Sequence, residues 1–251
     1  MNPASDIDKL ASHLRLAERI VFLTGAGMST ESGIPDFRSP TGIYATITSE
    51  TIFDLDTFLD DPAPFFEFAR SFFKNMQHAE PNAGHRAITD LQERHGKDVA
   101  VCTQNIDMLH QRAGTTTVYT VHGTTETSTC TRCEVRRKTE VLWPLIESGQ
   151  IPRHDHCGGV FKPDIVFFGE ALPEAMFAAS HRAIARADLL VVCGTSLGVY
   201  PAASLPSARR GDCILDIINR TPTPLDSSAH RVIRGTIGEA LADAVARLGA
   251  R

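Results

Sequence analysis

The chain has 251 residues, a formal net charge of -5 and 22% charged residues, a composition typical of an ordinary folded protein. The length allows one sizeable core, alone or with a small satellite, and the mild acidity gives no reason to expect nucleic acid as a partner. Neither a secretory signal nor an apolar run of ~18 residues is visible, so we expect a cytoplasmic protein that does not bind membranes.

Strands and helices are expected to alternate along the chain. A first helix carries Ile7, Leu10 and Leu14 on one face, with Ser5 as its N-cap. In chain order there follow a strand over 19–24, a helix over 83–95, strands over 99–103 and 117–121, a helix over 174–187, strands over 189–193 and 213–218, and a last helix with Leu241, Val245 and Leu248 on one face. The strand segments are nearly continuous in apolar residues, which is typical of strands buried on both faces of a parallel sheet. This alternation predicts a doubly wound, Rossmann-like α/β fold.

Two stretches interrupt the alternation. Residues 39–80 contain many phenylalanines but no buried strand, and they predict a helical insertion over an apolar cleft. Residues 124–163 are polar, cysteine-bearing and rich in turn residues, and they predict a small separate module. We therefore expect the Rossmann-like domain to comprise residues 1–38, 81–123 and 164–251.

The cysteines are of two kinds. Those in apolar runs have the setting of buried small hydrophobic residues: Cys102, Cys193 and Cys213. The others form a pattern in which Cys130-x-x-Cys133 is followed, after twenty residues, by His154-x-x-Cys157. This spacing predicts a four-ligand structural zinc site. His156 is a rival to His154 as fourth ligand, and a weak, partly empty site is a further alternative.

A glycine loop, Gly25-Ala-Gly27-Met-Ser-Thr-Glu-Ser-Gly33, follows the first expected strand. Glycines there allow a sharp turn and a close approach of backbone amides to a pyrophosphate. The loop departs from the ordinary dinucleotide fingerprint, because Thr30 occupies the place of the third glycine. No acidic residue follows at the end of a second strand to bind the ribose, so an ordinary Rossmann dehydrogenase is disfavoured.

Further motifs follow the glycine loop. It continues into Ile34-Pro-Asp-Phe-Arg38, and the chain later carries Thr103-Gln-Asn-Ile-Asp107, Leu109-His-Gln-Arg-Ala-Gly114, Val121-His-Gly123, Phe167-Phe-Gly-Glu170, Gly194-Thr-Ser-Leu197 and Ile218-Asn219. With these motifs the chain resembles the sirtuin family of NAD-dependent protein lysine deacylases, in the family's order and over nearly the whole length. Bacterial members are the most similar. The family usually has cysteine where this chain has His154.

The resemblance implies a role for each matching residue. His122 is the implied general base, which suits a side chain that titrates near neutrality, and Asn105 acts beside it at the reacting centre. Contacts to NAD are implied for Gly25, Ala26, Gly27, Thr30, Asp36, Phe37, Arg38, Gln104, Asn105, Ile106, Asp107, His122, Gly194, Thr195, Ser196, Asn219 and Arg220. Contacts to the acyl-lysine peptide are implied for Val166, Phe168, Gly169, Glu170, Leu197, Gly198 and Val199.

The implied reaction consumes NAD, releases nicotinamide and transfers the acyl group from a protein lysine to ADP-ribose. The loop from Ser39 to Ser49 has no lysine or arginine to meet an anionic acyl group, so a neutral group, acetyl first, is expected. The alternatives are another neutral acyl group, protein ADP-ribosylation, and a non-catalytic acyl-lysine-binding scaffold. The presence of His122 disfavours the last two.

Overall fold

The structure, a computed structural model, describes residues 3–37, 39–40, 42–46 and 50–249. Its larger part is built on a six-stranded parallel sheet. In spatial order the strands are β3 (Val118–Thr120), β2 (Asp98–Thr103), β1 (Arg19–Thr24), β7 (Leu189–Cys193), β8 (Ile214–Ile218) and β9 (Arg231–Ile233). The chain runs outward from β1 in one direction and then from β7 in the other, so the carboxyl ends of β1 and β7 flank a switch point.

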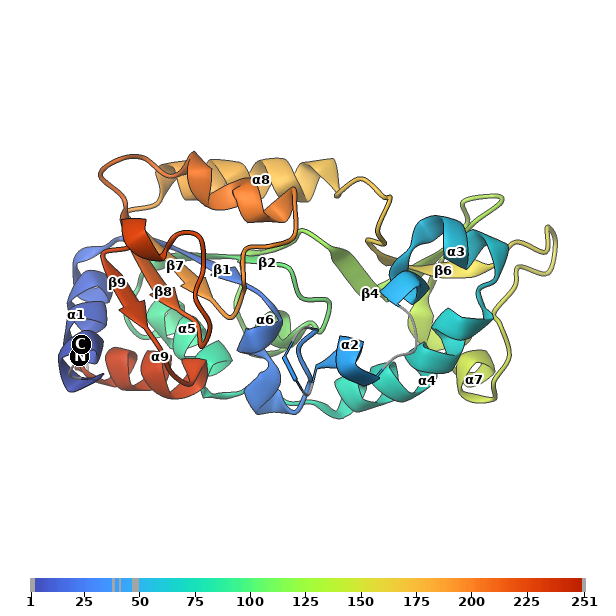
Figure 1. Cartoon of the computed structure of the whole chain (residues 1–251), viewed down its shortest axis with the longest axis horizontal. Coiled ribbons are helices and arrows are strands. Elements are labelled where there is room, and N and C mark those ends of the chain that lie inside the picture. Colours follow the sequence, from blue (N-terminus) through green and yellow to red (C-terminus); the bar gives the residue numbers. More distant parts are fainter. Residues whose placement is uncertain (1–2, 38, 41, 47–49, 250–251) are drawn as a thin grey trace.

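Helices cover both faces of this sheet (Figure 1). On one face, α1 (Pro3–Leu16), α5 (Ala83–Glu93) and α9 (Ile237–Ala246) bury Leu14, Ile88 and Leu241 against it. On the other face, α8 (Glu174–Arg186) and a 3-10 helix, η4 (Ala202–Ala208), bury Ile184 and Leu205. The short α6 (Leu109–Arg112) lies between β2 and β3 in the chain. The predicted doubly wound fold is confirmed.

The smaller part combines two segments that are distant in sequence (Figure 1). One is helical: α2 (Ile43–Thr46), a 3-10 helix η3 (Glu50–Phe53), α3 (Leu55–Asp60) and α4 (Ala63–His78). The other holds an antiparallel sheet in the order β5 (Arg136–Lys138), β4 (Gly123–Cys130) and β6 (Phe161–Ile165), together with α7 (Thr139–Glu147). Phe58 and Phe65 of the helices share one core with Leu142 and Phe161 of the sheet segment.

The first helix begins earlier than its expected cap. Ser5 lies inside α1, which begins at Pro3, so the prediction of Ser5 as the N-cap was wrong. A proline fits the first turn of a helix because the N–H that it lacks has no partner within the helix. The expected apolar stripe is present, since Leu10 and Leu14 are fully buried.

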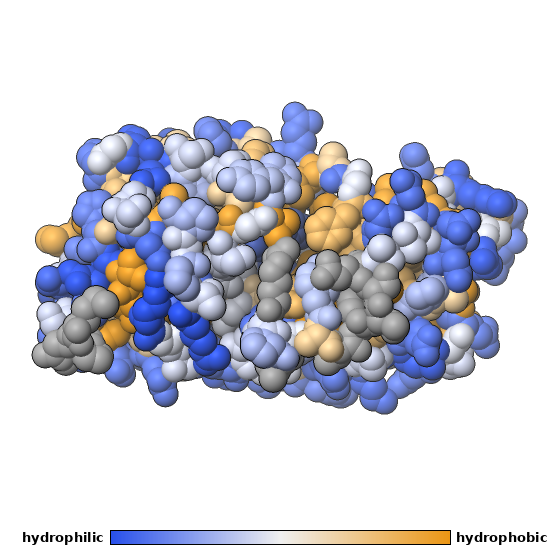
Figure 2. Space-filling model, in the orientation of Figure 1, coloured by the Kyte–Doolittle hydropathy of each residue, from blue (hydrophilic) through white to orange (hydrophobic). Residues whose placement is uncertain are grey.

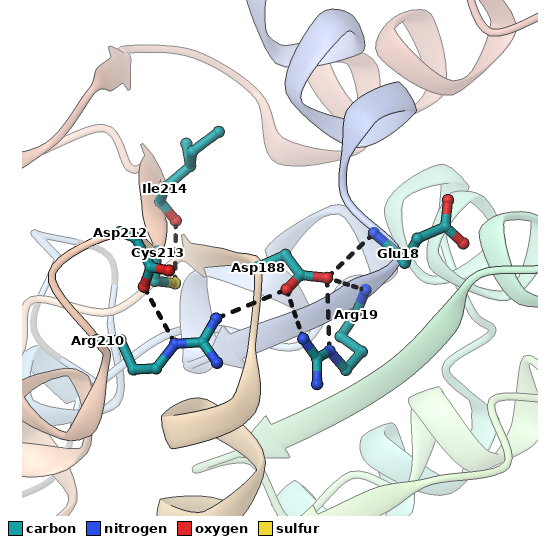
Figure 3. A network of polar contacts seen from close by, with 7 residues as sticks. All are labelled: Glu18, Arg19, Asp188, Arg210, Asp212, Cys213 and Ile214. Carbon is teal, nitrogen blue, oxygen red and sulfur yellow. Dashed lines mark hydrogen bonds and ion pairs between the residues drawn. The ribbon is translucent and has the colours of Figure 1, made fainter.

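A network of ion pairs and hydrogen bonds lies at the end of the sheet where β1, β7 and β8 begin (Figure 3). The Asp188 carboxylate accepts hydrogen bonds from the Arg19 backbone N–H at 2.9 Å and from the Arg19 guanidinium at 2.9 Å. The guanidinium of Arg210 approaches the same carboxylate at 3.8 Å. Hydrogen bonds from Arg19 hold the pKa of Asp188 below its ordinary value. The amino ends of these strands lie opposite their carboxyl ends, where α/β sheets bind ligands, so the network contributes to stability rather than to a binding site.

No helix among the described residues is long and apolar enough to cross a membrane. The face seen in Figure 2 is largely hydrophilic, with apolar side chains reaching the surface near its middle, where the two parts of the molecule meet.

Candidate functional site

A cavity of about 980 Å³ lies between the two parts of the molecule, at the carboxyl ends of the parallel strands. Most of the residues predicted to bind NAD or peptide line it: Ala26, Gly27, Thr30, Asp36, Phe37, Gln104, Asn105, Ile106, Asp107, His122, Val166, Phe168, Gly169, Glu170, Gly194, Thr195, Ser196, Val199, Asn219 and Arg220. Gly25 and Leu197 are buried and Gly198 is exposed, all outside the lining. Arg38 lies outside the described residues.

Close packing of two loops forms one wall of the cavity. The Gly27 N–H donates to the carbonyl oxygen of Gly194 at 2.9 Å, joining the loops that follow β1 and β7. A Cβ atom on Gly27 would lie 2.8 Å from the Gly194 Cα, so only glycine fits there. The Thr30 hydroxyl donates to the Gly27 carbonyl at 3.0 Å and holds the loop in its turn. Thr30 thus fixes the loop from within, at the position where the ordinary fingerprint has a third glycine.

A buried polar cluster lies behind this loop. Ser29 Oγ donates to Asp107 Oδ2 at 2.6 Å, and the Asn105 side-chain amide donates to Ser29 Oγ at 3.1 Å and to the Gly25 carbonyl at 3.1 Å. The Leu109 N–H donates to Asp107 Oδ1 at 2.9 Å. Burial raises the pKa of Asp107, and these hydrogen bonds oppose that rise. The structure therefore joins Asn105 and Asp107 through Ser29, a residue of the glycine motif to which the sequence had assigned no role.

Gln104 contributes a donor to the cavity. Its Oε1 accepts from the Thr195 hydroxyl at 3.2 Å, which fixes the orientation of the amide. The Nε2 atom is buried and has no hydrogen-bond partner within the described part of the chain. Because an unpaired buried donor is costly, its position on the cavity indicates that a bound molecule supplies an acceptor.

His122 is held in one tautomer. Its Nδ1 lies 2.9 Å from the carbonyl oxygen of Gln104, and because a carbonyl can only accept, Nδ1 carries the proton. Nε2 is then the unprotonated, basic nitrogen. Burial lowers the pKa of His122, so the ring is neutral at pH 7. This arrangement gives a base that is ready to accept a proton.

Aromatic side chains line the same cavity as His122. The Phe37 ring makes edge contacts with Tyr44 and Phe53, at centroid distances of 5.6 and 5.8 Å. Phe168 is 47% exposed and Tyr200 75% exposed, and both line the cavity. Exposed apolar side chains gathered on one cavity are typical of a binding surface, so this rim is suited to binding a further molecule. The sequence indicated this rim only weakly. Phe53 was one of many phenylalanines in the predicted insertion, and Tyr200 lies just beyond the motif Gly194-Thr-Ser-Leu197.

The backbone N–H and carbonyl of Phe168 already have hydrogen-bond partners. Its N–H donates to the Phe53 carbonyl at 2.8 Å, and its carbonyl accepts from the Leu55 N–H at 3.0 Å. The Glu170 carboxylate accepts from the Phe167 N–H at 2.7 Å and pairs with Lys162 at 2.8 Å. The side chain of Glu170 therefore holds the turn in shape, and the edge from 168 to 170 is rigid.

The predicted metal ligands lie together in the smaller part. The ligand atoms of Cys130, Cys133, His154 and Cys157 all lie within 4.8 Å of one another. His154 Nδ1 is 3.2 Å from the Sγ atoms of both Cys133 and Cys157. Such spacings suit a tetrahedral ion with bonds of about 2.0–2.3 Å. The His156 ring packs against that of His154 and lies outside this group.

Comparison with known proteins identifies relatives over nearly the whole chain. The model of the Sir2 family matches residues 25–201. An NAD-dependent protein deacetylase of Thermotoga maritima is 44% identical, with 83% of this chain and 85% of that protein covered. A structure of Sir2 with a p53 peptide and NAD+ is 38% identical, with a TM-score of 0.88 and coverage of 96% and 98%. Another, with deacetylated p53 peptide and 3′-O-acetyl ADP-ribose, is 39% identical, with a TM-score of 0.90 and coverage of 98% and 100%.

Proposed function

The chain belongs to the Sir2 family, and from this premise we propose that it is an NAD-dependent protein lysine deacetylase. In the proposed reaction nicotinamide leaves NAD and the amide oxygen of an acetyl-lysine bonds to the ribose carbon that nicotinamide has left. A water molecule is then consumed as the acetyl–nitrogen bond breaks, so that the lysine amine is released and the acetyl group remains as an ester on ADP-ribose. Relatives that are named as NAD-dependent protein deacetylases cover nearly the whole chain at about two-fifths identity, which supports the proposal.

The tautomer of His122 is the observation that carries the proposal. Its Nδ1–H is held by the Gln104 carbonyl, so Nε2 is free to accept the proton of a ribose hydroxyl. The lowered pKa keeps the ring neutral under physiological conditions. A scaffold protein that only binds acyl-lysine has no use for a neutral, oriented imidazole in the same cavity as a glycine loop.

The rest of the cavity suits the two ends of NAD. We assign the pyrophosphate to the loops of Gly27 and Gly194, because their amides and lack of side chains allow close approach. We assign the nicotinamide to Asn105 and Asp107 and the adjacent ribose to Gln104, whose free Nε2 matches a hydroxyl acceptor. Ala26, Thr30, Asp36, Phe37, Ile106, Thr195, Ser196, Asn219 and Arg220 complete the proposed NAD contacts, with Gly25 supporting them from behind.

The apolar rim suits an acetyl-lysine peptide. Val166 and Phe168 line the cavity where we place the apolar lysine stem. The segments 168–170 and 197–199 would flank an extended peptide, which would pair with the backbone at Gly169 and Gly198, because the backbone groups of Phe168 already have partners. Among the described residues that line the cavity, the one lysine or arginine is Arg220. It lies next to Asn219, after β8, away from the segments assigned to the peptide. A neutral acyl group is therefore favoured over an anionic one.

We propose that the metal is a structural zinc held by Cys130, Cys133, His154 and Cys157. Three thiolates and one imidazole are a common closed zinc set, and none of the four side chains is among those that line the cavity. The thiolate site suits the reducing cytoplasm, which we infer as the compartment. We retain the division into a Rossmann-like domain (1–38, 81–123 and 164–251), a helical insertion (39–80) and a zinc module (124–163).

The test is turnover of NAD with an acetyl-lysine peptide by the purified protein, followed by mass spectrometry. We expect nicotinamide, deacetylated peptide and acetyl-ADP-ribose in equal amounts, and their loss in His122→Ala. His181→Gln, a change at an exposed histidine of α8, is the matched control. Release of nicotinamide with ADP-ribose attached to protein would instead indicate an ADP-ribosyltransferase, and no consumption of NAD would refute the proposal.

A further inference from the structure

Asn82 ties the start of α5 to the back of the glycine loop. It is 9% exposed and does not line the cavity. Its Nδ2 donates to the Met28 carbonyl oxygen at 2.8 Å and to Ser32 Oγ at 3.1 Å. As the N-cap of α5, its Oδ1 accepts from the backbone N–H groups of Gly84 at 2.9 Å and His85 at 3.3 Å. Because two backbone donors hold the oxygen, the amide nitrogen must face the loop.

The two contacts of this nitrogen lie on either side of Ser29. Met28 ends one 3-10 helix, η1 (Ala26–Met28), and Ser32 ends the next, η2 (Thr30–Ser32). Ser29 joins them with a φ of −102° and a ψ of 0°, in the sparsely populated region between helix and strand. The side chain of Asn82 therefore bridges the two turns whose junction sets the direction of Ser29.

The peptide bond between Met28 and Ser29 is held from both sides. Its carbonyl oxygen accepts from Asn82, and its N–H donates to the Ala26 carbonyl at 3.1 Å. A rotation of this peptide would move the Ser29 hydroxyl away from Asp107, to which it donates at 2.6 Å. The placement of Asp107 thus depends on Asn82, although the two side chains belong to different elements.

The support behind Asn82 is itself fixed. The Asn82 N–H donates to His85 Nδ1 at 3.3 Å, which completes a reciprocal cap at the start of α5. The His85 ring is buried, and its centroid lies 4.7 Å from that of His110 in α6. His110 Nε2 is 3.1 Å from Oγ1 of Thr24, the last residue of β1. The glycine loop is therefore held at its start by α6 and along its back by α5.

We propose that Asn82 is a positioning residue for the nicotinamide end of the cavity and that it acts through the peptide bond between Met28 and Ser29. This inference rests on the proposed function only in that NAD occupies the cavity with its nicotinamide at Asp107. Without the amide donors of Asn82 the Met28 carbonyl is free to turn, and Ser29 no longer holds Asp107 in place.

The proposed pyrophosphate site does not depend on Asn82 in the same way. The hydrogen bond from the Gly27 N–H to the Gly194 carbonyl joins its two loops directly. ADP-ribose has the pyrophosphate but no nicotinamide. Loss of the Asn82 amide should therefore weaken binding of NAD more than binding of ADP-ribose.

The experiment measures binding of NAD and of ADP-ribose by calorimetry, without peptide, to the full chain and to two variants, Asn82→Asp and Asn82→Ser. Aspartate and serine are both good N-caps, so α5 stays capped, but neither carries the amide nitrogen. In both variants we expect the affinity for NAD to fall about tenfold more than that for ADP-ribose, the scale of one lost hydrogen bond. Asn75→Asp is the matched control, because it makes the same change at an exposed position of α4 outside the cavity lining, and it should leave both affinities unchanged.

A second measurement tests whether Asn82 acts through Ser29. Added to Ser29→Ala, the change Asn82→Asp should cause little further loss of NAD affinity, because both changes act on the same hydrogen bond to Asp107. Additive losses would contradict this route.

Equal losses for NAD and ADP-ribose, unfolding of both variants, or an unchanged ratio would overturn the inference, as would failure of the full chain to bind either compound. Deacetylation is measured separately with NAD and an acetyl-lysine peptide. If the ratio shifts in the variants while the full chain shows no deacetylation, the proposed function fails and the assignment of Asn82 stands.

Discussion

Removal of one buried hydroxyl tests whether the nicotinamide end of the cavity is built as described. Ser29 is 1% exposed and joins two side chains that are also buried, donating to Asp107 and accepting from Asn105. Ser29→Ala leaves Asp107 Oδ2 without this partner, while the Asn105 amide keeps the Gly25 carbonyl. A hydrogen bond to a charged group contributes about 1.5–3 kcal/mol, so we expect the free energy of unfolding to fall by about 3 kcal/mol.

The same change should slow catalysis. Without the Ser29 hydroxyl the pKa of Asp107, already raised by burial, rises further, and the side chain is less firmly placed against nicotinamide. A misplacement of about 1 Å typically costs about 10²-fold in rate, so we expect a loss of that order in kcat/KM for NAD. The assay is nicotinamide release at saturating acetyl-lysine peptide, at a temperature where the variant is folded by circular dichroism.

Ser12→Ala is the control, because the Ser12 hydroxyl donates to the Asp8 carbonyl within α1 and is remote from the cavity. It should change the free energy of unfolding by less than about 0.5 kcal/mol and leave kcat/KM unchanged. If Ser29→Ala is folded and retains the parent kcat/KM, then Ser29 does not organise the nicotinamide pocket and the reasoning is refuted.

Three further outcomes are expected. His122→Ala should retain the melting temperature within a few degrees and bind ADP-ribose, yet lose acetyl transfer by about 10²-fold or more; full activity would remove it as the base. His154→Ala should lower zinc affinity, measured by competition with a chelator, whereas His156→Ala should not, and the reverse ranking would move the fourth ligand. Burial lowers the pKa of His85 from 6.5 to about 4, so the unfolded chain binds a proton between these pH values and the native chain does not. The contribution of His85 to stability is therefore full above pH 6.5 and falls by about 3 kcal/mol toward pH 4 in urea titrations, so the loss should be less steep in His85→Gln and as steep as in the parent in His181→Gln.

The sequence predicted the parallel sheet well because its strands are buried on both faces. The segments 19–24 and 189–193 are nearly continuous in apolar residues, and they form β1 and β7 at the centre of the sheet. The sequence did not predict β4, whose residues Gly123–Cys130 are mostly threonine and other polar types. That strand is stabilised by pairing with β6 and by hydrogen bonds from threonines to Asp164, and neither produces an apolar period.

The roles of individual site residues could be predicted only where their motifs resemble those of a known family. Spacing alone gave the group of Cys130, Cys133, His154 and Cys157, because metal geometry constrains sequence separation. It could not reveal the link from Asn105 through Ser29 to Asp107, which joins the loop after β1 to the loop after β2. Nor could it show that the phenylalanines of residues 53–73 share a core with Phe161, since contacts between distant segments leave no local pattern.

The most direct test of the account follows the acetyl group itself. The full chain would be incubated with NAD and a peptide whose lysine carries a deuterium-labelled acetyl group, and the small-molecule products would be resolved by mass spectrometry. The account predicts that the label is recovered on ADP-ribose, in an amount equal to the nicotinamide released. Recovery of the label as free acetate with NAD intact, or release of nicotinamide while the label stays on the peptide, would contradict it.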